Sequence, residues 1–195
     1  FREQALEIKV VGLANSKNML FQEKGIPLDS WSHELKASEL PMDLEAFIAR
    51  MKRLNLANTI FVDNTASQEI ASHYASILEA SISISTPNKI ATSSSFDQYR
   101  MLKTIAKQRG VLFQYETNVG AGLPIISTLN DLILSGDRIQ KIEAVLSGSL
   151  SFIFNSFKPG VRFSDIVKEA QRRGYTEPDP REDLLGLDVR RKLII

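Results

Sequence analysis

The sequence of 195 residues contains no cysteine, and this limits the kinds of site that it can hold. Without thiols the chain forms no disulfide framework and no thiolate-ligated metal site. The lack of cysteine is compatible with a reducing compartment, and we expect a cytoplasmic protein. The two histidines, His33 and His73, lie far apart in the sequence, so a zinc site built on imidazoles is not expected.

Long apolar runs and an excess of charge are missing as well. No apolar stretch approaches the length of about 20 residues that spans a membrane, so we expect no membrane partner. The formal net charge is +1 and no long basic run occurs, which argues against a nucleic-acid partner. A G-x-G-x-x-G dinucleotide motif is also absent. The hydrophobic content of 43% and the charged content of 24% are ordinary for a globular protein.

Both ends of the sequence lack the usual terminal signals. Phe1 is not an initiator methionine, and the chain stops at "RRKLII" without a glycine, a proline or a polar cap. We therefore expect a piece of a larger protein, truncated at both ends.

Short apolar runs alternate with helical patterns in the first part of the chain. Buried strands are expected at residues 7–13 and 59–63, an alternating strand at 81–85 and a further strand at 111–117. Helices are expected around 44–54, after a cap at Ser67, and from about Phe96 to Gly110, while 14–41 should be mostly loop. This alternation predicts an α/β fold with a Rossmann-type, doubly wound parallel sheet over residues 1–120.

The regular alternation of strands and helices ends after that point, which predicts a second domain of α+β type over residues 121–195. A helix is expected at 124–134, a β-rich run at 138–154, and a helix at 163–173 with Ser164 as its cap. Asp179, Pro180 and Glu182 fit the cap, the first helical position and the reciprocal partner of a capping box.

Polar residues follow the predicted strands at the edge where such sheets bind ligands. Thr65 and Ser67 lie in "VDNTAS", and Lys89 ends "STPNK", so an anion site is one interpretation and a pair of capped turns with a surface lysine is the other. In "LANSK", Asn15 and Lys17 offer donors that suit a 2′-phosphate better than a ribose hydroxyl, although turns are rich in such residues.

Two further stretches leave a functional and a structural interpretation open. "ETNVGAGLP" (residues 116–124) places glycines where the backbone approaches a ligand or where it forms a tight interdomain turn. In "GYTEPDPREDLLGLDVRRK" (174–192), Asp188 and Lys192 are four residues apart and stack on one helix face. The pair is either a solvated surface or a lysine held charged for proton transfer.

Taken together, "VGLANSK", "STPNK", "ETNVGAGLPII", "GDRIQKIEAVLSGSLSFIFN" and "GYTEPDPREDLLGLDVRRKL" resemble homoserine dehydrogenase. The resemblance covers essentially the whole chain and is greatest to the dehydrogenase half of bifunctional aspartokinase/homoserine dehydrogenases. It implies that the glycine-rich loop of the first βα unit precedes residue 1. It also implies that much of the catalytic and dimerisation domain follows residue 195.

The resemblance implies reversible hydride transfer between NADPH, or NADH, and aspartate 4-semialdehyde to give homoserine. Lys192 matches the general acid/base, and Lys89 matches a lysine between nicotinamide and substrate. The remaining matches are substrate ligands (Glu177, Asp183 and Asp188), cofactor contacts (Asn15, Thr65, Lys89 and Gly174) and the ligands of a structural monovalent cation, usually sodium (Glu116, Val119, Ala121 and Leu123).

The implied partners are an amino-acid substrate, a second copy in a homodimer or higher oligomer, and possibly a fused aspartokinase domain. Glu182 stands where close relatives often carry Asp, a change that should be harmless. Two alternatives stay open: another Rossmann-type amino-acid dehydrogenase, and a module that only oligomerises or regulates. Retention of Lys89, Glu177, Asp188 and Lys192 together argues against the second, because a scaffold does not need that set.

Overall fold

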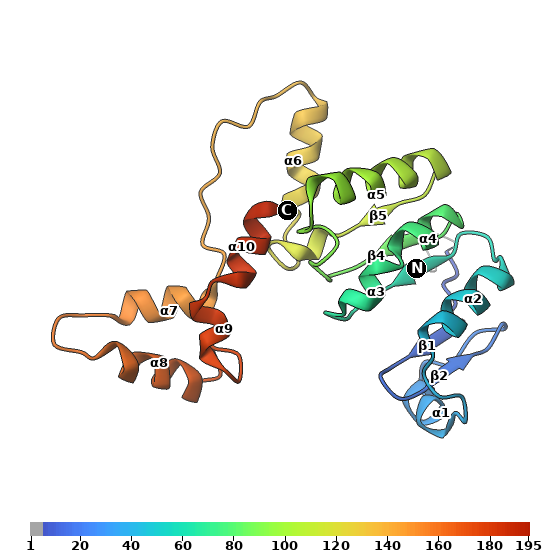
Figure 1. Ribbon diagram of the computed structural model, residues 1–195, viewed down its shortest axis with the longest axis horizontal. Helices are drawn as coiled ribbons and strands as arrows, with labels where there is room; N and C mark the ends of the chain where they lie inside the picture. The colour runs from blue at the N-terminus through green and yellow to red at the C-terminus, as the bar shows by residue number, and fades with distance from the viewer. Residues whose placement is uncertain (1–5) are drawn as a thin grey trace. The chain divides into compact units, whose positions relative to one another are not determined.

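The computed structural model describes residues 6–195, and the chain divides into two compact units, Phe1–Thr59 and Ile60–Ile195. Figure 1 shows the order of their helices and strands along the chain. Each unit is described by itself. No helix among residues 6–195 combines the length and the apolar character needed to cross a membrane.

The first unit pairs a small β-hairpin with two helices. Strands β1 (Gly12–Ala14) and β2 (Met19–Phe21) are antiparallel, and α1 (Trp31–Ala37) and α2 (Leu44–Leu54) follow them. The carboxylate of Asp43 accepts the Ala46 amide at 2.9 Å and so begins α2 as a cap. The apolar face of α2 is buried, and Phe47 contacts the Phe21 ring with centroids 4.6 Å apart.

The strand predicted at residues 7–13 is wrong in its bounds and its burial. Residues 7–9 are exposed and outside any strand, and only the last part of the prediction overlaps β1. The chain reverses at Asn15, whose side-chain oxygen accepts the backbone amides of Lys17 and Asn18 at 2.8 and 2.9 Å. This side-chain turn creates the partner strand β2 inside a stretch that was expected to be loop.

The second unit begins with a parallel sheet in the order β3-β4-β5. Its strands are β3 (Ile60–Val62), β4 (Ser83–Ser85) and β5 (Phe113–Gln114). Phe61, Ile84 and Phe113 are register partners, so their side chains share one face, and all three are buried. Ile60 and Val62 are more than half exposed, so the prediction that all of residues 59–63 would be buried holds only for part of the strand.

Helices connect these strands, as the alternation predicted. α3 (Gln68–Ser72) and α4 (Tyr74–Glu79) lie between β3 and β4, and α5 (Phe96–Arg109) lies between β4 and β5. Ser67 caps α3 by accepting the Ile70 amide at 3.3 Å, as predicted. Gly110 ends α5 with φ of 66°, a left-handed conformation that glycine adopts without strain.

The rest of the second unit is helical. It contains the 3₁₀ turn η2 (Glu116–Asn118), then α6 (Ile125–Leu134), α7 (Gly148–Ser156), α8 (Phe163–Arg172), α9 (Pro180–Leu184) and α10 (Leu187–Ile194). Ile153 of α7 packs with Ile166 and Ala170 of α8 in a small buried cluster. Gly186, at φ of 64°, separates α9 from α10.

The β-rich run predicted at 138–154 is wrong. Residues 138–147 have no regular structure, and α7 begins at Gly148 after Ser147, whose hydroxyl accepts the Leu150 amide at 3.1 Å. A strand needs a partner for its backbone groups, and no strand in residues 6–195 pairs with this run. Ile142 and Val145 accordingly remain 66% and 80% exposed.

One predicted helix cap and one predicted capping box are also corrected. Ser164 lies inside α8, and Arg162 is the residue before its first turn. Asp179 does cap α9, by accepting the Arg181 amide at 3.0 Å, and Pro180 is the first helical residue. Its side-chain partner is the Arg181 guanidinium at 2.6 Å and not Glu182, so a simple cap replaces the predicted capping box.

Candidate active site

A buried polar network joins the carboxyl ends of the parallel strands. Asp63 follows β3 and is 2% exposed, and its Oδ2 accepts the Tyr74 hydroxyl at 2.6 Å and the Asn88 side-chain amide at 3.0 Å. Thr86 follows β4, and its hydroxyl donates to the Asp63 carbonyl at 2.8 Å. The two strand-end loops that the sequence placed side by side are thus bonded to each other.

Asn118 extends the network to the loop after β5. Its side chain is fully buried, and with the amide oriented to satisfy its neighbours it donates to the carbonyls of Thr86 and Pro87 at 3.1 and 2.9 Å. Its oxygen accepts the Thr92 hydroxyl at 2.7 Å. All three strands therefore end in one set of hydrogen bonds.

Burial, reinforced by the hydrogen bond to Asp63, raises the pKa of the Tyr74 hydroxyl well above its ordinary value of about 10. The folded protein then keeps this proton where the unfolded chain would lose it. The stabilisation that comes from this raised pKa is fully present below pH of about 10 and declines at higher pH. At neutral pH Tyr74 is a fixed donor in the network.

Thr65 and Ser67 form a turn at the edge of this network. The Thr65 amide donates to Asp63 Oδ1 at 2.8 Å, and the Thr65 hydroxyl oxygen accepts the Ser67 amide at 3.0 Å. That hydroxyl still has its hydrogen to donate, and the side chain of Thr65 is exposed. The capped-turn interpretation of this stretch holds. The Thr65 hydroxyl hydrogen is not used in the turn.

The structure brings Lys89, Asp188 and Lys192 together. Asp188 Oδ1 lies 3.2 Å from Lys89 Nζ, and Asp188 Oδ2 lies 2.7 Å from Lys192 Nζ. The lysine side chains are 27% and 20% exposed, while the Asp188 side chain is 55% exposed. One carboxylate therefore faces two partly buried ammonium groups from segments about a hundred residues apart.

Lys192 has a second fixed partner. Its Nζ donates to the backbone carbonyl of Leu146 at 2.7 Å, from the irregular segment before α7. An ammonium has three donors, and two of them are engaged by Leu146 and Asp188. Sequence spacing predicted the Asp188 contact, whereas the Leu146 contact comes from the fold.

Glu177 and Asp183 form a neighbouring arrangement. Asp183 Oδ2 accepts the Glu177 amide at 2.8 Å, and Asp183 Oδ1 accepts the Ser149 hydroxyl at 2.7 Å. Ser149 is 7% exposed and lies in the first turn of α7, so Asp183 ties α9 to α7. Glu177 itself is exposed, and within residues 6–195 its carboxylate makes no hydrogen bond or ion pair.

In the "ETNVGAGLP" turn, the side chain of one predicted cation ligand, Glu116, has a structural role. The Glu116 carboxylate accepts the amides of Ile126 and Ser127 at 2.7 and 2.9 Å, so it caps the start of α6. Ala121 has φ of 51°, a left-handed backbone conformation that is unusual for a residue other than glycine. In the described residues no three acidic or histidine side chains gather, so a cation here would depend on backbone oxygens.

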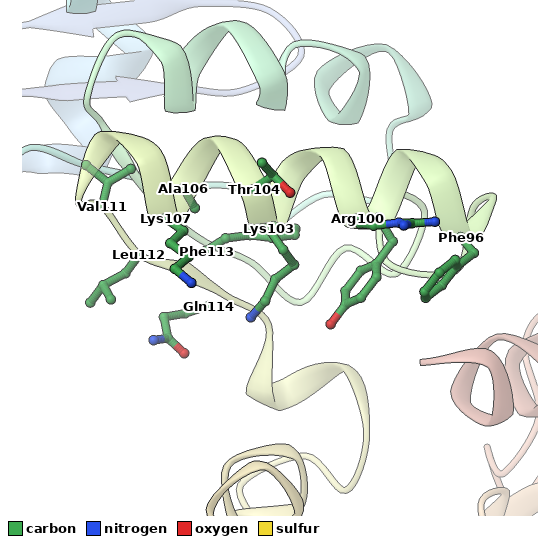
Figure 2. A pocket seen from close by; sticks show the side chains of 11 residues that line it. Phe96, Arg100, Lys103, Thr104, Ala106, Lys107, Val111, Leu112, Phe113 and Gln114 are labelled. Atoms are coloured by element: carbon green, nitrogen blue, oxygen red, sulfur yellow. The ribbon is translucent and has the colours of Figure 1, made fainter. Parts of the chain in front are cut away.

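Gly174 and Asn15, two further predicted residues, have structural roles in their own elements. Gly174, at φ of 71°, closes α8. Asn15 belongs to the first unit, where its side-chain oxygen makes the turn described above. A hollow of about 470 Å³ lies between α5 and β5, and Figure 2 shows Arg100, Lys103 and Phe113 among its lining residues. It contains none of the predicted site residues.

The network residues Asp63, Tyr74, Thr86, Asn88 and Asn118, with Ser149, were not predicted to belong to the site. Asp63 directly follows a strand, and Asn88 directly precedes Lys89. A polar residue at a strand end beside a candidate lysine was the available signal. It was too weak alone, because turns are generally rich in Asp and Asn.

The Asp188 carboxyl gives a direct test of the cluster. Burial acts to raise its pKa, but hydrogen bonds from Lys192 and Lys89 and the two positive charges lower it below its ordinary value of about 3.9. The resulting stability is present above about pH 4 and is lost as pH falls through the lowered pKa.

We expect Lys89→Met and Lys192→Met each to raise the pKa of Asp188, because each removes one positive partner. The measurement is an NMR titration of the Asp188 side-chain carboxyl carbon. Lys103→Met, which removes a lysine packed over the Tyr115 ring instead, is the control and should leave the midpoint unchanged. An Asp188 midpoint that ignores both cluster lysines would contradict the geometry.

Two family models match the chain. The model described as "Homoserine dehydrogenase, NAD binding domain" matches residues 1–116, and the one described as "Homoserine dehydrogenase" matches residues 124–195. The chain belongs to the homoserine dehydrogenase family. Its first part is a Rossmann-like NAD-binding domain with a parallel sheet, and the catalytic region of the family follows it.

The chain is similar both to bifunctional aspartokinase/homoserine dehydrogenases and to a relative named only as homoserine dehydrogenase. A chloroplastic bifunctional aspartokinase/homoserine dehydrogenase of Zea mays is 44% identical over 191 residues, which are 97% of this chain and 21% of the relative. A homoserine dehydrogenase of Schizosaccharomyces pombe is 47% identical over 175 residues, which are 87% of this chain and 46% of the relative. The chain thus spans about a fifth of the maize relative and less than half of the yeast one.

A solved structure supports the same relationship. A hyperthermophilic archaeal homoserine dehydrogenase in complex with NADPH matches with a TM-score of 0.75 at 25% identity. The match covers 94% of this chain and 57% of that one. The homoserine dehydrogenase fold therefore extends over nearly all the described residues.

Proposed function

We propose that the protein interconverts L-homoserine and L-aspartate 4-semialdehyde with NADP as its cofactor, in the biosynthesis of threonine, methionine and isoleucine. The observation that carries this proposal is the cluster of Lys89, Asp188 and Lys192. The cluster joins the strand-end edge of the nucleotide-binding part to the catalytic region. Family membership supplies the reaction class.

In this proposal Lys192 handles the proton of the substrate hydroxyl. When the aldehyde is reduced, negative charge develops on its oxygen, and the Lys192 ammonium stabilises that charge and donates a proton to it. In the oxidative direction Lys192 accepts the same proton. The nicotinamide, when bound, supplies or accepts the hydride. Asp188 and the Leu146 carbonyl hold the Lys192 nitrogen in place for both directions.

The acidic residues suit an amino-acid substrate. We propose that Glu177 binds the substrate ammonium, because its carboxylate is exposed while its backbone amide is fixed by Asp183. Asp183 supports the pocket, and Asp188 contributes to substrate binding as well as holding the lysines.

The residues at the strand ends fit part of a dinucleotide. We propose Asn15, Thr65, Lys89 and Gly174 as cofactor contacts, with Thr65 offering its free hydroxyl hydrogen. The NADPH complex of the archaeal relative supports NADP, and NAD stays possible. The 195 residues contain no G-x-G-x-x-G loop, so these four contacts do not cover the pyrophosphate.

A monovalent cation, sodium by preference, is proposed for the turn after β5. Its ligands would be oxygens of Glu116, Val119, Ala121 and Leu123. The Glu116 carboxylate is engaged with α6, so the Glu116 contribution would come from its backbone oxygen. The role is to stiffen the turn.

We further propose a boundary between residues 120 and 121, a homodimer or higher oligomer, and fusion to an aspartokinase. The boundary is supported by the gap between the two family matches at residues 116 and 124. Fusion is supported by the bifunctional relatives, which carry both activities in their names.

The experiment that tests the function is homoserine-dependent reduction of NADP⁺ by the protein at its full natural length. We expect reduction with L-homoserine and little with L-serine or L-threonine, whose hydroxyls sit elsewhere on the carbon chain. Reduction with another hydroxy amino acid but not with homoserine would favour a different amino-acid dehydrogenase. Binding of NADP⁺ without any reduction would favour a regulatory module.

A further inference from the structure

The loop that carries Lys89 is held from two sides by buried amides. Residues 86–90 leave the end of β4 and run to the lysine whose Nζ lies 3.2 Å from Asp188. Lys89 makes that contact at the end of a long side chain with many rotamers. The loop fixes the Cα from which the ammonium extends to the carboxylate.

Asn88 fixes the chain immediately before Lys89. Its Nδ2 donates to Asp63 Oδ2 and to the Ser67 carbonyl, both at 3.0 Å. Its Oδ1 accepts the Ile90 amide at 3.0 Å, and its own amide donates to the Thr86 hydroxyl at 2.9 Å. The residue is 2% exposed, so these bonds face no competition from bulk water.

Asn118 fixes the same loop from the other side. It binds the carbonyls of Thr86 and Pro87, the two residues before Asn88. With both amides in place, the backbone entering Lys89 is tied to β3, to the start of α3 and to the turn after β5. A loop bonded to three separate elements has little freedom to shift.

We propose that Asn88 is a positioning residue that sets Lys89 at the Asp188 carboxylate. The catalytic consequence rests on the proposed dehydrogenase function, whereas the placement of Lys89 does not. Replacing Asn88 with alanine would leave Asp63 Oδ2 and the Ile90 amide each without one partner. The loop would then relax, and Lys89 Nζ would move away from Asp188.

The first test is a double-mutant cycle between Asn88→Ala and Lys89→Met in the protein at its full natural length. We expect Asn88→Ala to lower kcat about tenfold or more when Lys89 is present, since small displacements of reacting groups are costly. In the Lys89→Met background the same change should lower kcat less than about twofold, because Asn88 acts through Lys89. A purely structural role would instead give the same factor in both backgrounds.

The second test needs no catalytic activity. Lysine acetylation followed by mass spectrometry reports how readily each Nζ reacts, and Lys89 is 27% exposed and ion-paired in the intact loop. We expect Asn88→Ala to raise the acetylation rate of Lys89 several-fold and to leave that of Lys103, on α5, unchanged. If homoserine oxidation is never detected, this measurement still decides whether Asn88 places Lys89.

Two variants separate positioning from folding. Tyr115→Phe removes a hydroxyl whose partner, the Tyr99 hydroxyl at 2.7 Å, lies on α5 and not on the Lys89 loop, so it should change neither kcat nor Lys89 acetylation. Asn88→Ser keeps an acceptor for the Ile90 amide. It replaces Asn88→Ala in both tests if the alanine variant does not fold. Equal kcat losses with and without Lys89, or unchanged Lys89 acetylation in folded Asn88 variants, would overturn the proposal.

Discussion

Replacing Lys192 with alanine is expected to lower kcat for homoserine oxidation by about 10²–10⁴-fold while NADP⁺ still binds. The range is the usual contribution of a positioned general acid or base. Lys192 is the residue with the most fixed surroundings in the cluster, at 2.7 Å from both Asp188 Oδ2 and the Leu146 carbonyl. Its loss removes the proposed proton donor and leaves Asp188 with Lys89 alone.

The measurement is steady-state reduction of NADP⁺ together with titration of cofactor binding by fluorescence. Arg191→Ala is the matched control, because Arg191 is an exposed cation on the same helix. It should retain nearly full activity. A Lys192→Ala variant that keeps a substantial part of its kcat would show that Lys192 only supports the local structure.

Lys192→Arg separates charge from proton transfer. Arginine preserves the positive charge beside Asp188, but its pKa lies above about 12, so it does not exchange a proton at neutral pH. We expect the arginine variant to keep the lowered pKa of Asp188 and to remain nearly inactive. Recovery of the rate with arginine would assign Lys192 a purely electrostatic role.

Replacing Asp63 with alanine is expected to lower the free energy of unfolding by about 3 kcal/mol. The change removes one partner each from the Tyr74 hydroxyl, the Asn88 amide and the Thr65 amide, and a buried donor left unpaired costs about 1–3 kcal/mol. Relief from burying the carboxylate offsets part of the sum. The measurement is urea unfolding, read from the midpoint at constant slope.

Asp97→Ala is the control for that experiment. Asp97 is 91% exposed and makes one loose ion pair with Arg100 at 3.6 Å. Its removal should change the unfolding free energy by less than about 0.5 kcal/mol. If the two variants unfold at the same urea concentration, the buried network does not hold the strand ends together.

Local features of the fold followed from the sequence, because they depend on neighbours in the chain. Ser67 and Asp179 cap helices where the pattern predicted them, and Gly110 closes α5. The Asp188–Lys192 contact is of the same kind, since four residues make one helical turn. Periodicity and capping rules describe these contacts completely.

The contacts that build the site join distant segments, and periodicity does not encode them. Asp63 meets Asn88 across 25 residues, and Lys192 meets the Leu146 carbonyl across 46. The roles assigned to Lys89 and Lys192 came from family resemblance, and the structure adds that they share one carboxylate. The prediction at 138–154 failed for a related reason: β-branched residues favour a strand, yet a strand forms only where another offers backbone partners.

The two fixed contacts of Lys192 have a consequence for the direction of proton movement. A free ammonium spins about its Cε–Nζ bond, so its hydrogens exchange places and none has a lasting direction. With one hydrogen on Leu146 and one on Asp188, that rotation is restricted, and the third hydrogen points in the direction that these two contacts leave. In the proposed reaction an oxygen in that direction is the one placed to exchange a proton, so the backbone of residue 146 would help to choose which atom of a bound molecule reacts.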